Sequence, residues 1–313
     1  MLRVMAAEMM YGKPVAEQIE SHVRLGVAEF VRVYQITPRL DIVQVGSSPA
    51  STRYVRKKLE ACERLGMRAE LHLFDETVTG AQLRDEVCRL SHDGDVHGIL
   101  VQLPLPALIE NPDTAGGVDK FDIFDAIAAE KDVDGVSRYS VPALYRARQN
   151  EMMFLPCTPL AVLRMLAYYK IETQGKVAVA VGRNDITAKP MHHIFGGRIC
   201  NATAIWCHRY TPKADHDAFM RQADIVVTSV GNVHYKVTAE MIKPGAVVID
   251  IGTRVDSDGR LRGDMDFDSV KEVASYITPV PKGVGPVTVA ALTENLLRAA
   301  QFCLGVRKPG YEF

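Results

Sequence analysis

"VAVAVGRNDITAKPMHHIF", Val177–Phe195, reads as an apolar strand, a tight turn at Gly182 and a helix. A Rossmann fold begins in this order, and backbone N–H groups at such a turn can hold a pyrophosphate at the positive end of the helix. The match to the G-x-G-x-x-G pattern is incomplete, because Asn184 occupies the second glycine position and Ala188 comes one residue late for helix packing. A plain strand-to-helix connection therefore stays an alternative at this point.

The rest of the chain repeats the same alternation of strand-like and helix-like segments. After Lys176 the strand-like runs continue as "ATAIWCH", "ADIVVTSVG", "AVVIDIG" and "SYITPV". Before it, "RLDIVQV" (39–45), "RAELHLF" (68–74) and "VHGILVQLPLP" (96–106) are separated by helical patterns, the first from Pro49 to Leu65. Alternation of this kind is typical of parallel sheets covered by helices, and 313 residues suffice for two such α/β domains.

Composition restricts the class of protein more than it identifies one. The formal net charge of −1 lacks the basic excess of a nucleic-acid binder, and no apolar run is long enough for a membrane span. The six cysteines form no C-x-x-C pair and no metal-like cluster with histidine, so we expect reduced thiols and no metal site. "MLRVMAAEMM" is a poor secretion signal, which favours a cytoplasmic protein over a mitochondrial one.

Side chains near the ends of the later strands predict the kind of dinucleotide. "CHRYT" places His208 and Arg209 where a Rossmann enzyme contacts the adenosine ribose, and Arg183 lies in the first turn. Two guanidinium groups could bind a 2′-phosphate, which favours NADP over NAD, although both could also be solvated loop arginines. The segment Thr228–Asn232, which includes Gly231, and Gly252 are expected to line the same crevice.

Three motifs of the first half contain candidate catalytic groups. Tyr54 and Lys58, spaced i and i+4, share one stripe of a helix, and Gln102 interrupts an apolar strand. "KDVDG" places Asp132 and Asp134 before a glycine. Each has an ordinary structural explanation: a wet basic surface for Lys58, a buried structural amide for Gln102, and a turn or helix cap for the two acids.

The order of these motifs is more specific than any one of them. "SSPASTRYVRKKLEACERLG", "GILVQLPLP", "KDVDG", "PCTP", "VGRNDITAKPM", "ADIVVTSVG" and "ITPVPKGVGPVTVAALTENLL" cover nearly the whole chain. In this order they resemble the bifunctional methylenetetrahydrofolate dehydrogenase/methenyltetrahydrofolate cyclohydrolase family. The resemblance implies an N-terminal α/β catalytic domain (residues 1–155 plus 289–313) and a C-terminal Rossmann-like NADP-binding domain (156–288). The last helix would return to the first domain.

The resemblance also implies residue roles. Tyr54 would lie against the folate ring, Lys58 would be the general acid/base bonded to Gln102, and Asp134 would accept N–H bonds from the pterin. Gly283 and Pro286 of the loop "PVPKGVGPVT" would approach the substrate. Cofactor contacts would come from Gly182, Arg183, Asn184, His208, Arg209, Thr228 and Gly231. Tetrahydrofolate derivatives would be the partners, in a homodimeric enzyme of one-carbon metabolism that supplies purine biosynthesis.

The sequence departs from the family pattern at three places. Lys282 stands where a glycine is common, Thr187-Ala188 replaces a Val-Gly pair, and "ENPDTAGGVD" (Glu110–Asp119) resembles an insertion. Three other functions stay open. They are a monofunctional dehydrogenase of the same family, a different two-domain NADP oxidoreductase such as an amino-acid or shikimate dehydrogenase, and a non-catalytic folate- or nucleotide-binding module.

Overall fold

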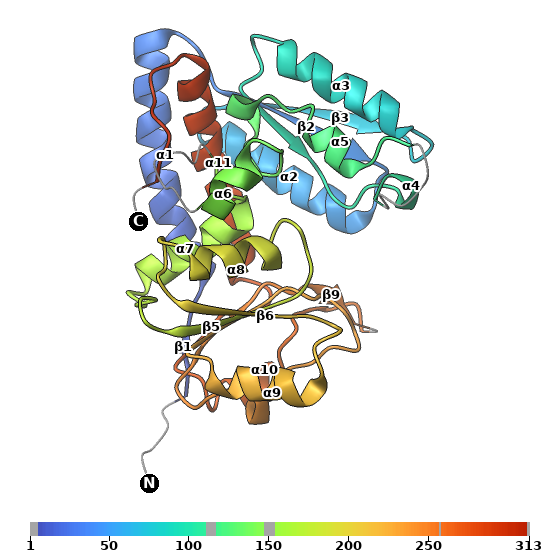
Figure 1. Cartoon of the computed structure of the whole chain (residues 1–313). Coiled ribbons are helices and arrows are strands. Elements are labelled where there is room, and N and C mark those ends of the chain that lie inside the picture. The colour runs from blue at the N-terminus through green and yellow to red at the C-terminus, as the bar shows by residue number, and fades with distance from the viewer. Residues whose placement is uncertain (1–5, 111–116, 147–153, 257, 312–313) are drawn as a thin grey trace.

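The computed structural model describes residues 6–110, 117–146, 154–256 and 258–311, which form two α/β domains joined by long helices (Figure 1). Residues 1–5, and with them part of the segment considered as a targeting signal, lie outside the described residues, as do 111–116 of the expected insertion. None of the described helices combines the length and the apolar composition that a membrane crossing requires.

The first domain is built on a three-stranded parallel sheet of order β3-β2-β4. Its strands are β2 (Arg39–Val45), β3 (Arg68–Phe74) and β4 (Gly98–Val101). Its helical segments are α1 (Gly12–Tyr34), α2 (Pro49–Arg64), α3 (Gly80–His92), α4 (Ala107–Glu110), α5 (Lys120–Phe124), η1 (Ala129–Lys131) and α6 (Ser140–Arg146). β4 is shorter than the expected strand 96–106, because Pro104 and Pro106 have no N–H to donate to a ladder.

Local signals place α2 and α3 where the sequence pattern predicts them. Ser48 caps α2 by accepting the N–H of Ser51, and Pro49 occupies the first helical position. Thr79 and Gln82 form a capping box at the start of α3. These caps fix the start of α2 just after β2, and α2 then carries Tyr54 and Lys58 at the carboxyl end of the sheet.

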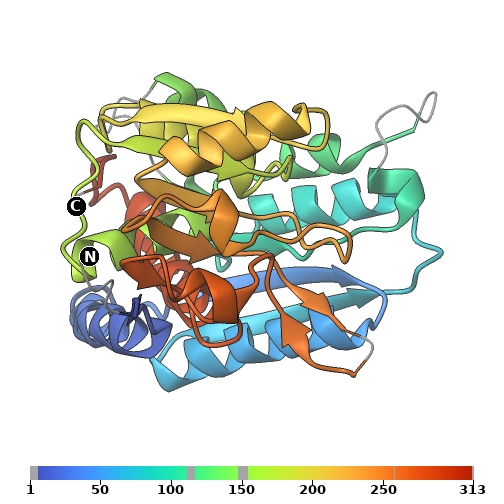
Figure 2. The same ribbon diagram turned by 90° about the horizontal axis from the view of Figure 1, so that it is seen from below.

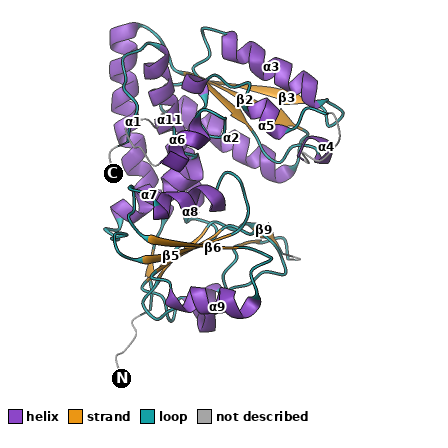
Figure 3. Cartoon of the chain, viewed as in Figure 1, coloured by secondary structure: helices purple, strands orange, loops and turns teal. Residues whose placement is uncertain are grey.

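The second domain contains a six-stranded parallel sheet of order β1-β11-β8-β7-β5-β6. Its strands are β5 (Val177–Val181), β6 (Thr203–Cys207), β7 (Ile225–Thr228), β8 (Val247–Asp250), β11 (Tyr276–Ile277) and β1 (Glu8–Met9). The helical segments α8 (Ala188–Gly196), α9 (Lys213–Gln222), η3 (Ala239–Met241) and α10 (Phe267–Val270) and the hairpin β9 (Arg254–Val255) and β10 (Leu261–Arg262) complete it. Helices flank this sheet on both sides, as the view from below and the view coloured by secondary structure show (Figures 2 and 3).

The α/β fold class with a Rossmann-like second domain is thus confirmed, with two differences in detail. β1 pairs in parallel with β11, so the first described strand belongs to the second domain's sheet and not to the first domain. The last helix, α11 (Val284–Cys303), begins within the loop expected to run to Thr288, because Gly285 and Pro286 fit a helix's first turn. α11 returns to the first domain as expected and packs against α1 and α7 (Cys157–Tyr168).

Buried Asn295 of α11 joins the last helix to segments far away in the chain. Its side-chain amide donates to the carbonyls of Val133 (2.7 Å) and Leu155 (3.0 Å), and its oxygen accepts the hydroxyl of Tyr311 (2.7 Å). The same Tyr311 oxygen accepts the N–H of Leu155 at 2.9 Å. One amide therefore satisfies three buried polar groups at the point where the chain passes between domains.

We predict that Asn295→Ala lowers the free energy of unfolding by about 2–4 kcal/mol, since it leaves two buried carbonyls and a buried hydroxyl without this partner. Urea denaturation followed by circular dichroism measures the change. Gln222→Ala, at the exposed end of α9, is the control, with an expected change within about 0.5 kcal/mol. Equal effects of both substitutions would contradict a structural role for the Asn295 amide.

Candidate active site

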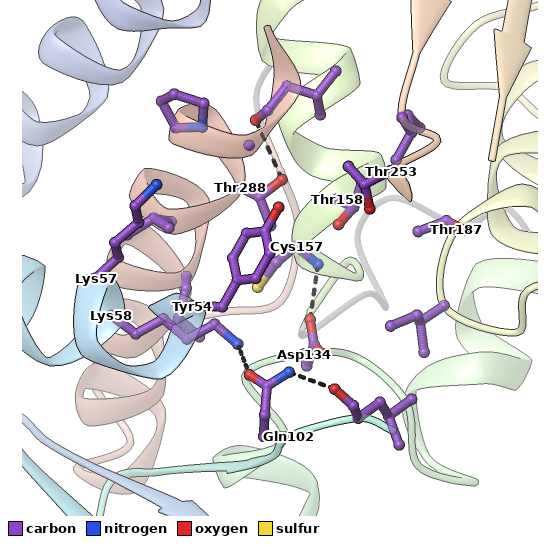
Figure 4. Close-up of a pocket in the computed structure, with 18 of the residues that line it drawn as sticks. Tyr54, Lys57, Lys58, Gln102, Asp134, Cys157, Thr158, Thr187, Thr253 and Thr288 are labelled. Carbon is purple, nitrogen blue, oxygen red and sulfur yellow. Dashed lines mark hydrogen bonds between the residues drawn. The ribbon is translucent and has the colours of Figure 1, made fainter. Parts of the chain in front are cut away.

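A cleft of about 1190 Å³ lies between the two domains and collects most of the predicted functional residues. Its first-domain wall includes Tyr54, Lys58, Gln102 and Asp134, and the loop from Pro279 to Pro286 crosses it. Arg183 to Thr187 line it from the second domain. In Figure 4 the side chains of Tyr54 and Lys58 leave α2 toward Asp134 and Cys157. Residues that are far apart in sequence thus share one cavity.

Lys58 is held by an amide and not by a carboxylate. Its Nζ donates to Oε1 of Gln102 at 2.8 Å, and Nε2 of Gln102 donates to the carbonyl of Leu103 at 2.7 Å (Figure 4). The backbone N–H of Gln102 is bonded to Val43 of the neighbouring strand, at 2.8 Å. The end of the sheet thereby fixes Gln102, and Gln102 orients the amine without adding a negative charge.

The surroundings of Lys58 make its amine easier to deprotonate. Burial of the ammonium lowers the pKa of Lys58 from its ordinary 10.5, and the negative charge of Asp134 opposes this without reversing it. Burial likewise raises the pKa of the Asp134 carboxyl, which the positive charge of Lys58 partly offsets. A pKa shifted toward neutrality makes the amine better suited to exchange protons, which general acid–base catalysis requires.

Asp134 is positioned by residues that no local pattern indicates. Its carboxylate accepts the N–H of Cys157 at 3.2 Å, and the Cys157 thiol donates to the carbonyl of Val133. Burial raises the pKa of Cys157 well above its usual range, so the thiol stays protonated. Since Asn295 also bonds to Val133, the last helix and the start of α7 together hold Asp134 at the cleft.

The loop that precedes α11 forms the remaining wall. Gly283 caps the helix, and Pro286 and Gly283 both line the cleft. Lys282 has φ of 89°, a conformation that costs a non-glycine residue about 1–3 kcal/mol, which explains why glycine is common there. Its carbonyl accepts the N–H of Gly12 at 2.8 Å, and a Cβ on Gly12 would lie 1.9 Å from the Gly283 oxygen. The start of α1 thus fixes this loop.

The nucleotide half of the site lies where β5 and β7 are neighbours and the strand order reverses. Gly182 ends β5 with φ of 135°, and a Cβ there would lie 2.4 Å from the carbonyl oxygen of Ser229. The hydroxyls of Thr187 and Ser229 are 2.6 Å apart. Asn184 turns its oxygen onto the N–H of Ile186 at 2.8 Å. Such a tight, glycine-initiated turn at the topological switch point is typical of a dinucleotide site.

The two candidate phosphate-binding arginines meet on one aromatic ring. The guanidinium of Arg209 lies 4.7 Å, and that of Arg183 5.7 Å, from the ring centroid of Tyr210. Arg209 also donates to the Tyr210 hydroxyl at 2.9 Å, and the ring of His208 packs edge-on to Tyr210. Arg183 lines the cleft, whereas His208 and Arg209 lie beyond its lining, at the end of β6.

Two other predicted cofactor residues have their polar groups engaged beneath the crevice. The hydroxyl of fully buried Thr228 donates to Asp250 at 3.3 Å, and the N–H of Gly231 donates to Asp264 at 2.8 Å. Neither residue lines the cleft, whereas Ser229 does. Burial raises the pKa of Asp250 to about 7, with the Asp264 charge adding to it. These carboxylates shape the loop, and of the Thr228–Asn232 segment it is Ser229 that lines the cleft, with its hydroxyl bonded to Thr187.

Asp41, Glu70 and His72 form a polar cluster away from the cleft. Their ligand atoms lie within 4.8 Å of one another. However, Arg39 donates to Asp41 at 2.8 Å and to Glu70 at 2.8 Å, and His72 is bonded to Asp41 at 2.8 Å. A guanidinium thus already neutralises these carboxylates, and the cluster is a hydrogen-bonded network on the first sheet.

Both domains match models of one protein family. Residues 10–134 match the tetrahydrofolate dehydrogenase/cyclohydrolase catalytic domain, and residues 156–304 match the NAD(P)-binding domain of the same family. The chain is 41% identical over 301 residues to the bifunctional protein FolD of Paracidovorax citrulli, covering 96% of this chain and 100% of the relative. It is 40% identical to FolD of Anoxybacillus flavithermus, covering 95% and 99%.

Solved structures agree with these matches. The bifunctional FolD methylenetetrahydrofolate dehydrogenase/cyclohydrolase of Campylobacter jejuni superposes with a TM-score of 0.86 at 36% identity, covering 95% of this chain and 99% of the other. The corresponding Trypanosoma brucei enzyme, described in complex with NADP cofactor and an inhibitor, gives a TM-score of 0.86 at 35% identity, covering 96% and 99%. The likeness extends over both domains.

Substitutions at Gln102 should move the pH dependence of cyclohydrolase activity in opposite directions. Gln102→Glu places a negative charge beside the Lys58 ammonium, which favours the charged form, raises its pKa and shifts the rise of kcat/KM to higher pH. Gln102→Met removes an acceptor for the ammonium and shifts the rise to lower pH, with a lower plateau because the amine is less well oriented.

The profiles are measured by the loss of methenyl absorbance without nucleotide, after subtraction of the buffer rate. A shift of both variants in the same direction would show that Lys58 is not the group that titrates.

Proposed function

The chain belongs to the tetrahydrofolate dehydrogenase/cyclohydrolase family, and from this premise we propose which residues perform its two reactions. The protein is an enzyme that oxidises 5,10-methylenetetrahydrofolate with NADP and hydrolyses the 5,10-methenyl product to 10-formyltetrahydrofolate. The observation that supports the assignment of residues is the Lys58–Gln102 pair, which faces the nucleotide half across one cleft. One bound folate can therefore contact both the Lys58–Gln102 pair and the nucleotide half of the cleft.

Oxidation requires alignment more than proton transfer. NADP, when bound, accepts the hydride that leaves the methylene carbon between N5 and N10. Tyr54 would contact the face of the folate ring, and Asp134 would bind the edge of the pterin. Gly283 and Pro286 would complete the wall of the cleft. Tyr54 is 36% exposed and so leaves an aromatic face for a ring to pack on. Correct placement of two reacting rings accounts for a large part of the rate of such reactions.

Hydrolysis requires a group that takes and returns a proton. The neutral Lys58 amine removes a proton from the water that attacks the cationic methenyl carbon. This addition leaves a neutral carbinol. The ammonium then gives its proton to N5 as the C–N5 bond breaks, while the carbinol hydroxyl loses its proton to solvent and becomes the C=O of the formyl group on N10. A buried lysine beside a cationic substrate suits both steps, because its pKa is lowered and Gln102 adds no charge.

The nucleotide half fits NADP by its own chemistry. Gly182, Arg183 and Asn184 would hold the pyrophosphate and its surroundings at the turn before α8. Arg183 and Arg209, both held near the ring of Tyr210, would bind the 2′-phosphate, with His208 beside them. Thr228 and Gly231 would act through loop shape, since their polar groups are bonded to Asp250 and Asp264.

The monofunctional alternative has less support than the bifunctional one. A dehydrogenase alone would need no amine in the folate wall, yet Lys58 and Gln102 are bonded to each other at 2.8 Å. We further assign the enzyme to the cytoplasm, where its six free cysteines would stay reduced and its formyl product would supply purine biosynthesis.

A homodimer is the proposed assembly, and edge strand β3 is the surface that best suits it. Within the described residues β3 pairs only with β2, and it exposes 40% of Leu71 and 58% of Leu73. An edge strand with free backbone groups and apolar side chains is suited to pairing with a second copy.

We predict that Lys58→Met lowers the rate of methenyltetrahydrofolate hydrolysis by about 10²–10⁴-fold, the contribution of a general acid/base, and lowers NADP-dependent oxidation far less. Both reactions are measured separately by absorbance. Arg53→Met, which removes an exposed cation of α2 outside the cleft lining, is the control and should keep both activities. A Lys58→Met enzyme that hydrolyses the methenyl compound normally would overturn the assigned role.

For the assembly, we predict that Leu73→Lys converts the dimer to a monomer by placing a charge on the β3 edge. Leu25→Lys changes a leucine of α1 that is more exposed still, at 68%, and should keep the dimer. Light scattering after size-exclusion chromatography gives the mass of each. An unchanged dimer in Leu73→Lys would place the interface elsewhere.

A further inference from the structure

Lys120 forms an ion pair across the cleft that no motif predicts. Its Nζ lies 3.0 Å from Oε2 of Glu110 and 3.2 Å from Oδ2 of Asp185. Glu110 ends α4 and Lys120 begins α5, both in the first domain, whereas Asp185 lies in the loop between β5 and α8 of the second. All three line the cleft, and the Lys120 side chain is only 14% exposed.

Asp185 receives one cation from each domain. Lys189, in the first turn of α8, pairs with Oδ1 of Asp185, and Lys120 pairs with Oδ2. Burial alone would lower the pKa of Lys120, but Glu110 and Asp185 outweigh it and raise the pKa. Burial would raise the pKa of Asp185, but Lys189 and Lys120 outweigh it and lower the pKa. The pair therefore stays ionised at neutral pH, and its partial burial protects it from screening.

The loop that carries Asp185 is already tied to its own domain. Asn184 caps the turn at Ile186, its carbonyl accepts the N–H of Lys189 at 3.2 Å, and Thr187 is bonded to Ser229. The bond to Lys120 adds a connection to the domain that holds the folate wall. Because these bonds hold the short loop together, a restraint on the position of Asp185 also restrains its neighbours Arg183 and Asn184.

We propose that Lys120 is a positioning residue for the dehydrogenase reaction. Its ion pair with Asp185 fixes the nucleotide loop at a set distance from the folate wall and so sets the approach of the two reacting rings. The groups proposed to move the proton in hydrolysis, Lys58 and Gln102, both lie in the first domain, so hydrolysis does not depend on this distance. The inference rests on the proposed function, and it gives a role to Glu110 and Lys120, which stand at the two ends of the segment where the sequence departs from the family pattern.

The test compares the two activities within each variant. Lys120→Met should lower kcat of NADP-dependent oxidation about tenfold, the scale of a small misplacement of reacting groups, while hydrolysis stays within about twofold. Lys189→Met removes the other cation from the same carboxylate without breaking the bridge between domains, and both activities should stay within about twofold. In a double-mutant cycle, Lys120→Met should have little further effect on oxidation when Asp185→Asn is already present.

A second readout needs no folate. Trp206, the single tryptophan of the sequence, donates to the carbonyl of Gly182 at the start of the loop, so its fluorescence reports NADPH binding there. The dissociation constant for NADPH should rise in Lys120→Met and not in Lys189→Met. Equal losses of both activities in Lys120→Met, or equal effects of Lys120→Met and Lys189→Met, would overturn the proposal. Loss of the proposed function itself would appear separately, as an inactive wild-type enzyme with intact NADPH binding.

Discussion

The structure depends on keeping one ammonium group, that of Lys58, inside a protein wall without a directly bonded carboxylate. An amide acceptor orients it, and the opposite charge of Asp134 acts on it from the same first-domain wall. A carboxylate in place of Gln102 would stabilise the ammonium, raise its pKa and leave less of the amine in the neutral form that accepts a proton. The site therefore accepts an incompletely compensated charge, and the surrounding fold must hold its partners rigidly.

Two long-range supports provide that rigidity. Gln102 is fixed by the end of the first sheet, through its backbone bond to Val43. Asp134 is fixed by the start of α7 and by α11, through Cys157 and Asn295. α11 begins in the cleft at Gly283 and packs on α1, so one helix connects the substrate loop, the hinge between domains and the core. In the proposed function, this arrangement would let two chemically different reactions use one folate position, with the nucleotide half required for oxidation alone.

Much of the fold could be predicted from the sequence, because strand periodicity and glycine turns are local signals. β1 was not, since a two-residue strand has no periodicity and its partner β11 lies more than two hundred residues away. In the site, helix geometry predicts that Tyr54 and Lys58 share one stripe of α2. The bond between Lys58 and Gln102, by contrast, was expected only from the family resemblance. Thr228 illustrates a limit: successive strand residues point to opposite faces, so the motif's threonine is buried and Ser229 meets the cleft. The Lys120–Asp185 pair and the Asn295 network join distant segments, which one sequence does not reveal.

The central claim is that burial lowers the pKa of Lys58 in the free enzyme. It is tested most directly by a carbon-13 NMR titration of protein labelled at the lysine ε-carbons, with the Lys58 signal identified by its absence from Lys58→Met. We expect the midpoint of the Lys58 titration to lie below the ordinary 10.5. A midpoint at or above that value would mean that the cleft stabilises the ammonium, and Lys58 could not serve as the base for hydrolysis.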